Sequence, residues 1–392
     1  MNIALDGLKV LDLTRLLPGA FCTQLFADFG ADVLKIEQPG SGDYNRQFAP
    51  LARKESGSFL LLNRNKRSMT LNLKAAEGRD IFGRLVKEAD VIVEGFRPGV
   101  MTRLGLGYEA LQALNPRVVY CAISGFGQDG PDALRSGHDL NYMGIAGALQ
   151  LFGTPRTGPM VPGLSIADVG GGSLMAAFGI LTALAARERT GRGQFVDISM
   201  TDGLVSWLCY HAADYLFAGV EPRGGVQQFL GGAPCYNVYR CADGLYLTLG
   251  IIEAHFWQRF CELIGREDLK ADQWPAGEAA ERQFACLQEI FAARNRDHWV
   301  QTLVAADIPA GPVNSMEEAF RDPQFVHRRM LQHLEHPVEG RIPQLGFPIK
   351  LSDTPGAMRT PPPLLGQHTK DVLRDLGYGP GDISAFARDG VI

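Results

Sequence analysis

Two neighbouring residues, His138 and Asp139, place an imidazole beside a carboxylate in the stretch SGHDLNY. Both side-chain types serve as general acids and bases in enzymes. Adjacent residues point in different directions on a helix or a strand, so we expect His138 and Asp139 not to be each other's partners. The alternative is structural, with Asp139 as the N-cap of a short helix that begins there.

Two further carboxylates stand where helices are expected to begin. Asp168 lies in ADVGGGS, at the head of a long helix expected over 168–193, and Glu253 follows a predicted strand and opens a helix. The structural alternative for each is a capping residue or a favourable charge in the first helical turn. The glycines at 170–172 are poor helix formers, and beside a carboxylate we interpret them as space for a ligand to approach.

Basic residues cluster in the amino-terminal half of the chain, notably in NRNKRS and GFRPGVMTRLG. Because arginine and lysine pair well with phosphate, these residues predict a polyphosphate ligand, and the alternative is a solvated surface. The set comprises Lys35, Arg64, Lys66, Arg67, Arg97 and Arg103.

Strand and helix patterns alternate over the first 125 residues, which predicts an α/β fold with a parallel, doubly wound sheet. Ligands of such sheets bind outside the carboxyl ends of the strands, which we place at Thr14-Arg15, Glu94-Gly95 and Ser124-Gly125. No G-x-G-x-x-G follows the first strand and no histidine spacing favours a metal, so we expect neither a nicotinamide dinucleotide nor a metal site. The strands are expected over 8–13, 31–37, 68–73, 90–95 and 117–125, and helices over 18–30 and 75–89.

The composition is that of a globular protein of two or three domains, with 392 residues, 46% of them hydrophobic and 21% charged. A formal net charge of −5 predicts no general affinity for nucleic acid or an anionic membrane, and no uninterrupted apolar run predicts a membrane span. Seven cysteines without a C-x-x-C pair, and a start without the pattern of a signal peptide, predict a cytoplasmic protein with free thiols. For Cys235 we favour a buried structural role over catalysis.

We expect the chain to form a large domain and a smaller α+β domain joined by a glycine- and proline-rich hinge. The smaller domain begins with a hairpin that has a D-G turn, and helices near 254–264, 281–293 and 296–305 follow. The tail after the proline-rich segment 343–363 predicts two short helices. The expected boundaries are 1–215 and 331–392 for the large domain, 216–232 for the hinge and 233–330 for the smaller domain.

Taken together, these segments resemble the class III CoA-transferase (CaiB/BaiF) family, which includes the α-methylacyl-CoA racemases. The resemblance covers nearly the whole chain, from GLKVLDLTRLLPGAF through NRNKRSMTLNLK, ADVIVEGFRPGVMTRLGLGY, GHDLNY, ADVGGGS and GGAPCYNVYRCADG to LLGQHT. It implies a Rossmann-like large domain built from both chain ends. It also implies a homodimer of two chains interlocked as rings, with an active site between domains of different chains.

The resemblance further implies that the substrates are coenzyme A thioesters and that no prosthetic group is needed. By position in the family, Arg97, Arg103 and Lys74 would contact the CoA nucleotide or diphosphate. We add three residues to this predicted binding set: Arg15 and Gly125, which stand at strand ends, and Asp139, to which we assign capping or orientation.

The catalytic residues distinguish two reactions within the family. Its racemases use an aspartate and a histidine as acid and base, matched here by Asp168 and His138, and a glutamate matched by Glu253 that hydrogen-bonds the histidine. Its transferases need only the aspartate, as a nucleophile that forms a mixed anhydride. The presence of all three residues favours a racemase or epimerase acting at the thioester α-carbon.

A CoA-transferase stays the alternative, because segments such as IPAGPVNSMEEAFRDPQ look more like a transferase. A non-catalytic CoA-binding protein is a third possibility. For the racemase, we expect backbone N–H groups at the head of the helix near Asp168 to stabilise the enolate oxygen.

Overall fold

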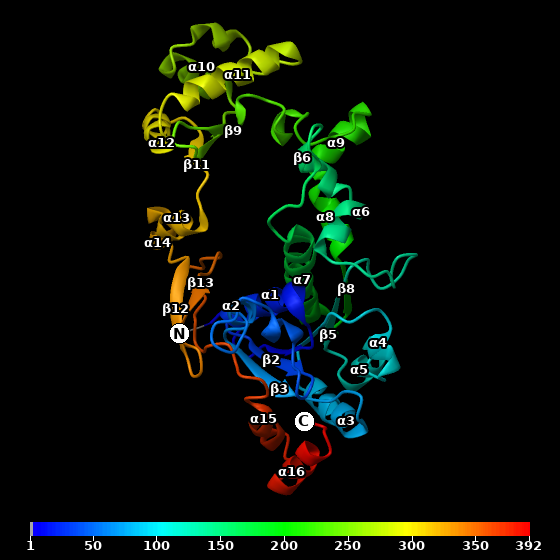
Figure 1. Cartoon of the computed structure of the whole chain (residues 1–392). Coiled ribbons are helices and arrows are strands. Elements are labelled where there is room, and N and C mark those ends of the chain that lie inside the picture. The colour runs from blue at the N-terminus through cyan, green and yellow to red at the C-terminus, as the bar shows by residue number, and fades with distance from the viewer. Residues whose placement is uncertain (1–2) are drawn as a thin grey trace. The chain divides into compact units, whose positions relative to one another are not determined.

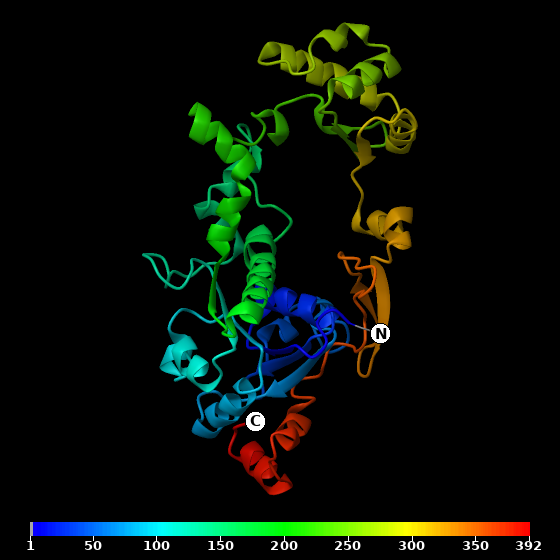
Figure 2. The ribbon, with the colours of Figure 1, turned by 180° about the vertical axis from the view of Figure 1, so that it is seen from behind.

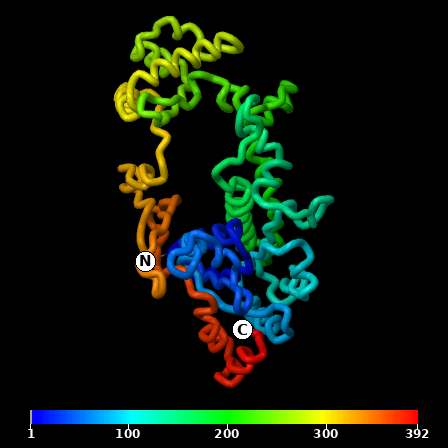
Figure 3. The backbone as a smooth tube through the Cα atoms, in the orientation of Figure 1, coloured from blue at the N-terminus to red at the C-terminus, as the bar shows by residue number. Residues whose placement is uncertain are grey.

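The structure is a computed structural model that describes residues 3–392. The chain divides into two compact units. The first comprises the described chain up to Ala146 with Leu164–Trp207 and Pro323–Ile392, and the second comprises Gly147–Gly163 and Leu208–Asp322. In Figure 3 the blue amino-terminal and the red carboxyl-terminal segments both belong to the first unit. The boundaries between the units differ from the expected domain boundaries. Residues 147–163 belong to the second unit, and the later boundary falls after Trp207 rather than near residue 215.

The first unit is organised around a parallel six-stranded sheet in the order β3-β2-β1-β4-β5-β8. The strand order changes direction between β1 and β4, where the loops after the strands separate and open a crevice. The expected α/β fold with a parallel sheet is confirmed. The sixth strand was not expected, because all its residues but Ser199 are exposed or half-buried and they form no apolar run. The strands are β1 (Lys9–Asp12), β2 (Asp32–Glu37), β3 (Lys66–Thr70), β4 (Val91–Glu94), β5 (Val119–Ser124) and β8 (Phe195–Ser199).

Helices cover both faces of this sheet (Figures 1 and 2). Helices α1 and α7 pack on one face, and α3, α5 and α15 enclose an apolar core on the other, around side chains such as Leu34, Phe82 and Leu373. The helices of this unit are α1 (Leu16–Asp28), α2 (Gly57–Leu62), α3 (Ala76–Val86), α4 (Val100–Arg103), α5 (Tyr108–Leu114), α6 (Asp139–Ile145), α7 (Met175–Thr190), α8 (Met200–Trp207), α14 (Pro323–His327), α15 (Thr369–Asp375) and α16 (Pro380–Arg388), with a 3-10 turn η1 at Tyr44–Gln47.

The long helix expected over 168–193 has two parts, a π-helical segment η3 (Ala167–Leu174) and the α-helix α7. The glycines of η3 allow it to pack closely on α8. A Cβ at Gly171 would meet the backbone of Met200, and one at Gly170 would meet the ring of Trp207. The space beside these glycines is therefore filled by protein, and our interpretation of it as space for a ligand was wrong.

The continuous segment Ala167–Thr190, formed by η3 and α7, is apolar and long enough to cross a membrane by length and composition alone. A long helix was expected here, but its composition was not expected to suit a membrane span. It packs against α1, α8, β5 and β8, and 44% of its most apolar window is buried. Core helices of folded domains commonly have this composition, so the segment is weak support for a membrane span.

The second unit contains a three-stranded antiparallel sheet in the order β11-β10-β9. The expected hairpin with its D-G turn is confirmed, as are the three helices after it. Its core gathers Trp257, Phe260, Phe291 and Leu303. The elements are η2 (Ala148–Leu151), β6 (Gly153–Thr154), β7 (Gly158–Pro159), α9 (Cys209–Ala218), η4 (Gln228–Leu230), β9 (Tyr236–Arg240), β10 (Tyr246–Gly250), α10 (Ala254–Leu263), η5 (Glu267–Ala271), α11 (Glu278–Ala292), α12 (Arg296–Ala305), β11 (Ala310–Pro312) and α13 (Met316–Arg321).

The chain returns to the first unit through a hairpin of β12 (Leu331–His336) and β13 (Gly340–Leu345). The proline-rich segment then runs beside the amino-terminal region, where the N–H of Asn65 donates to the carbonyl of Thr360 at 3.0 Å. The two short helices expected in the tail, α15 and α16, are confirmed.

Candidate active site

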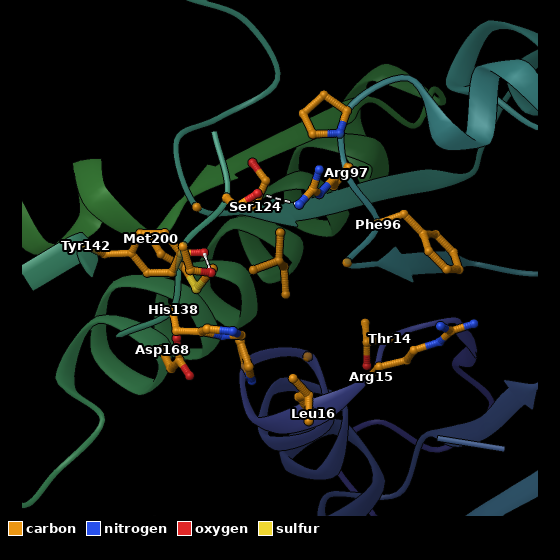
Figure 4. Close-up of a pocket in the computed structure, with 18 of the residues that line it drawn as sticks. Thr14, Arg15, Leu16, Phe96, Arg97, Ser124, His138, Tyr142, Asp168 and Met200 are labelled. Carbon is orange, nitrogen blue, oxygen red and sulfur yellow. Dashed lines mark hydrogen bonds between the residues drawn. The ribbon is translucent and has the colours of Figure 1, made fainter. Parts of the chain in front are cut away.

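A pocket of about 640 Å³ opens in the first unit at the carboxyl ends of β1, β4 and β5 (Figure 4). This is the edge of the sheet where the strand order predicts ligand binding. The strand-end residues Thr14, Arg15, Gly95, Ser124 and Gly125, all expected at this edge, line the pocket together. Its remaining lining residues are Leu13, Leu16, Pro18, Gly19, Tyr44, Phe96, Arg97, Pro98, Ile123, Ala133, Arg135, Ser136, Gly137, His138, Asn141, Tyr142, Asp168 and Met200.

His138 and Asp168, 30 positions apart in the sequence, line the same pocket. His138 is the residue before α6, and Asp168 is the second residue of η3. Figure 4 shows both side chains on one side of the pocket, with Arg15 and Phe96 on the other. Burial, and after it the charge of Asp139, raises the pKa of Asp168 to about 6. A carboxyl with that pKa exchanges protons readily near neutral pH.

Asp139 orients Asp168 and does not contact His138 as a partner. The carboxylate of Asp139 accepts a hydrogen bond from the backbone N–H of Asp168 at 3.0 Å. The N-cap of α6 is His138, one residue before the position expected, and the Asn141 side chain accepts from the backbone N–H of His138 at 3.0 Å. Of the roles assigned to Asp139, orientation is therefore supported, while the N-cap position was wrong.

The backbone at the head of η3 has fewer free donors than expected. The N–H of Asp168 donates to Asp139, and the N–H of Val169 donates to the carbonyl of Ser165 at 3.1 Å. A thioester oxygen at this point would have to compete with those acceptors. The expectation that these N–H groups stabilise an enolate oxygen is thus not met by Asp168 and Val169.

Tyr142 packs against both the loop after β5 and the turn before α6. Its hydroxyl donates to the carbonyl of Gly137 at 2.5 Å, and its ring fills the space beside Gly125 and Gly137. Burial and the charges of Asp168 and Asp139 raise the pKa of Tyr142 to about 12, so the phenol keeps its proton. Only glycine fits beside this ring, which explains the residue at 125 without a ligand contact.

The loop after β4 presents Arg97 to the pocket. The carboxyl of Glu94 accepts the N–H of Phe96 at 2.6 Å, and burial raises the pKa of Glu94 to about 7. Arg97 donates to the hydroxyl of Ser136, and Arg15 lies over the ring of Phe96 with 5.5 Å between its Cζ and the ring centroid. With Arg135, three exposed arginines thus line a pocket that also holds a carboxyl and an imidazole.

Three predicted residues lie elsewhere. Lys74 and Arg103 are exposed in the first unit and are not among the residues that line this pocket, so their contact with CoA stays a prediction. Glu253 is the N-cap of α10 in the second unit, at the end of the strand-helix connection where we expected it.

The polyphosphate interpretation was wrong for three of the basic residues. Lys35 and Lys66 are fully buried on β2 and β3, where Lys66 pairs with Asp12 at 3.2 Å and Lys35 with Asp43 at 3.1 Å. Arg64 is likewise buried against Asp28. Arg67 forms a half-exposed pair with Asp32.

These buried pairs hold the β1–α1 loop, which lines the pocket. Lys35 Nζ donates to the carbonyl of Thr14 at 2.8 Å, and Asp43 accepts the N–H of Leu16 at 3.3 Å. Burial alone would raise the pKa of Asp12, but Lys35 and Lys66, with two threonine hydroxyls, lower it to about 2. The cluster therefore fixes the β1–α1 loop, where Leu16 has a φ of 61° that leucine rarely adopts.

Several pocket residues escaped the sequence reasoning. Several segments of the chain, both loops and helix ends, supply them, and no spacing in the sequence joins these residues: Tyr44, Phe96, Arg135, Ser136, Asn141, Tyr142 and Met200. The adjacency of Phe96 to Arg97, and of Asn141 to the His138 turn, was the only available signal.

Burial raises the pKa of Cys235 to about 11, which supports its structural interpretation. Within residues 3–392, no group of three His, Cys, Asp or Glu side chains gathers so as to hold a metal ion.

The chain belongs to CoA-transferase family III, whose sequence model matches residues 5–369. It is 37% identical to an acyl-CoA transferase of Fusarium pseudograminearum, over 99% of this chain and 88% of the relative. It is 34% identical to the human α-methylacyl-CoA racemase, over 100% of this chain and 98% of the relative. A CaiB/BaiF family protein from Brucella suis has a similar structure, with a TM-score of 0.83 and 34% identity, covering 96% of this chain and 100% of that one.

The predicted family resemblance is therefore confirmed. The protein is a member of an enzyme family that acts on acyl-CoA thioesters. Its relatives include both CoA-transferases and a racemase.

Proposed function

We propose that this protein is an acyl-CoA racemase or epimerase that moves a proton at the α-carbon of a 2-methylacyl-CoA thioester. The observation that carries the proposal is the presence of His138 and Asp168 in one pocket, with the pKa of Asp168 raised to about 6. Racemisation needs two acid/base groups, one for each face of the α-carbon. An imidazole and a carboxyl whose pKa is raised by burial are groups of that kind.

In the proposed reaction, one of the pair removes the α-proton as the C–H electrons move into an enolate of the thioester. The other member delivers a proton to the opposite face, and the thioester carbonyl re-forms. No atom is gained or lost. Arg97 and Arg15 would hold the CoA phosphates at the strand ends, because guanidinium groups pair with phosphate. The resemblance further suggests that Glu253 hydrogen-bonds the imidazole, which would fix its tautomer.

CoA transfer is the second candidate, favoured by the 37% identity to a fungal acyl-CoA transferase. Here the Asp168 carboxylate would attack the thioester carbonyl and release the CoA thiolate, leaving a mixed anhydride. The CoA thiolate would attack the aspartyl carbonyl of the anhydride and release the donor carboxylate, leaving an aspartyl-CoA thioester. An acceptor carboxylate would attack this thioester and release the CoA thiolate, which would then attack the acceptor carbonyl and free the Asp168 carboxylate. This route needs no acid or base at His138.

Substitution of His138 by alanine separates the two reactions. A racemase should lose activity with resolved 2-methylacyl-CoA by about 100-fold or more, because one face has no proton donor or acceptor. A transferase should keep most of its activity with an acyl-CoA and a free acid. The readouts are chiral chromatography of the hydrolysed acyl group and exchange of CoA between acids. A fully active His138→Ala racemase would contradict the role given to His138.

We also propose a cytoplasmic homodimer, and we propose neither nucleic-acid nor membrane binding. Helix α9 supports the dimer, because none of its residues is buried. Its apolar side chains Leu216 and Phe217 are 70% and 90% exposed. An uncovered apolar helix of this kind indicates a protein partner. The family resemblance implies that this partner is a second copy of the chain.

A further inference from the structure

Ser124, the last residue of β5, lines the pocket, and its buried hydroxyl has no hydrogen-bond partner in the described chain. The residue is 7% exposed, and within residues 3–392 no group offers its Oγ a hydrogen bond. Of the buried side-chain polar atoms that lack a hydrogen-bond partner in this part of the chain, Ser124 Oγ alone belongs to a residue that lines the pocket. Buried hydroxyls are normally paired, so an unpaired one in a ligand pocket points to an acceptor on the ligand.

Polar groups of the neighbouring residues already have hydrogen-bond partners. Thr201 donates its hydroxyl to the carbonyl of Gly125 at 2.6 Å and its N–H to the same oxygen at 3.1 Å. The hydroxyl of Tyr142 is engaged by Gly137. These bonds fix the β5 end on both sides and leave the Ser124 hydroxyl free for a bound molecule.

The position of Ser124 selects the part of the ligand that it meets. In Figure 4 it lies between Arg97 and the group formed by His138 and Asp168. A CoA thioester with its phosphates at Arg97 and its α-carbon at Asp168 would cross the end of β5 with its pantetheine arm and thioester. The acceptors on this stretch are carbonyl oxygens, of the two pantetheine amides and of the thioester itself.

We propose that the Ser124 hydroxyl donates a hydrogen bond to a carbonyl oxygen of the bound CoA thioester arm. The proposal rests on the proposed function, since it takes a CoA thioester as the ligand. It also supplies a donor that the backbone at Asp168 does not, because that N–H is bonded to Asp139. Ser124 is thereby a specificity-determining residue for ligands with a carbonyl at this point.

Calorimetric titration tests the proposal with two ligands, butyryl-CoA and S-butyl-CoA, a thioether that lacks the thioester carbonyl. The loss of one neutral hydrogen bond predicts that Ser124→Ala binds about threefold to tenfold more weakly. Ser124→Thr keeps a hydroxyl and should retain most of the affinity. Weaker binding of butyryl-CoA alone assigns the thioester carbonyl, and weaker binding of both ligands assigns a pantetheine amide. Unchanged affinity of Ser124→Ala for both ligands would overturn the proposal.

Two controls separate this result from other causes. Ser384→Ala removes a hydroxyl that donates to the carbonyl of Pro380 at 2.8 Å on α16, outside the pocket, and should leave both affinities unchanged. The Tm of Ser124→Ala should not fall, because the lost hydroxyl made no hydrogen bond within the described chain. Failure of the wild-type protein to bind either ligand would contradict the proposed function, a result distinct from failure of the Ser124 proposal.

Discussion

The proton affinity of Asp168 is set by its surroundings, first by burial and then by the charge of Asp139. The same neighbour also holds the Asp168 backbone through a hydrogen bond of 3.0 Å. Asp139 thus acts on both the position and the proton affinity of Asp168. The sequence revealed the two carboxylates and the histidine as candidates. It did not reveal this contact, because it joins residues 29 positions apart and depends on how α6 packs beside η3.

Asp139→Asn tests this control. The amide keeps an oxygen that can accept the Asp168 N–H, but the negative charge is removed. The pKa of Asp168 should therefore fall below about 6 while staying above its ordinary value, because burial, the larger cause, remains. Since Asp168 must be ionised to remove a proton, the acidic limb of the kcat/KM profile should move to lower pH. An acidic limb at the wild-type position would show that the charge of Asp139 does not act on Asp168.

The β1–α1 loop depends on charges buried beneath it. Asp12 ends β1, Lys35 lies within β2 and Lys66 begins β3, which are three adjacent strands, and all three side chains are fully buried. The strands themselves were predictable from their apolar runs. The pairing of the charges was not, because a lysine on a strand has the same pattern whether it faces a phosphate or a buried carboxylate.

Asp12→Asn should destabilise the protein by about 3–5 kcal/mol, because it leaves the buried charge of Lys66 without its ion-pair partner. Asp32→Asn is the matched control. It breaks a pair whose side chains are 36% and 44% exposed and should cost less than about 1 kcal/mol. Urea unfolding at pH 7 measures both changes, and equal costs would contradict the account.

The Asp12 contribution also has a defined pH dependence. Its pKa in the folded protein, about 2, is below the ordinary value, so folding favours the ionised form. The stabilisation is present above about pH 4 and is lost as the pH falls toward the folded pKa. The difference in the free energy of unfolding between the wild-type protein and Asp12→Asn should therefore become smaller only in strong acid.

At the scale of the whole molecule, the chain leaves its first unit after Ala146 and again after Trp207, and it returns at Leu164 and at Pro323. The expectation that both chain ends build one unit followed from the family resemblance. The excursion at 147–163 was not expected, because its short β6 and β7 strands carry no periodic pattern.

Phe217→Glu tests the proposed dimer. Helix α9 exposes its apolar residues to solvent in the single chain, and burying a charge at that position against a partner would be costly. Light scattering coupled to size-exclusion chromatography should give twice the mass of 42.7 kDa for the wild-type protein and a smaller mass, or insoluble protein, for the variant. A monomeric wild-type protein, or a variant that dimerises as the wild type does, would contradict this assignment of α9.

The central claim is that His138 and Asp168 exchange the α-proton of a thioester. It is tested most directly by incubating the wild-type protein with one enantiomer of a 2-methylacyl-CoA in D₂O, without any acceptor acid, and following the α-carbon by NMR. Deuterium should enter the α-position as the two enantiomers equilibrate. Retention of the α-proton, together with movement of CoA to a free acid once one is added, would contradict it and assign the protein to CoA transfer.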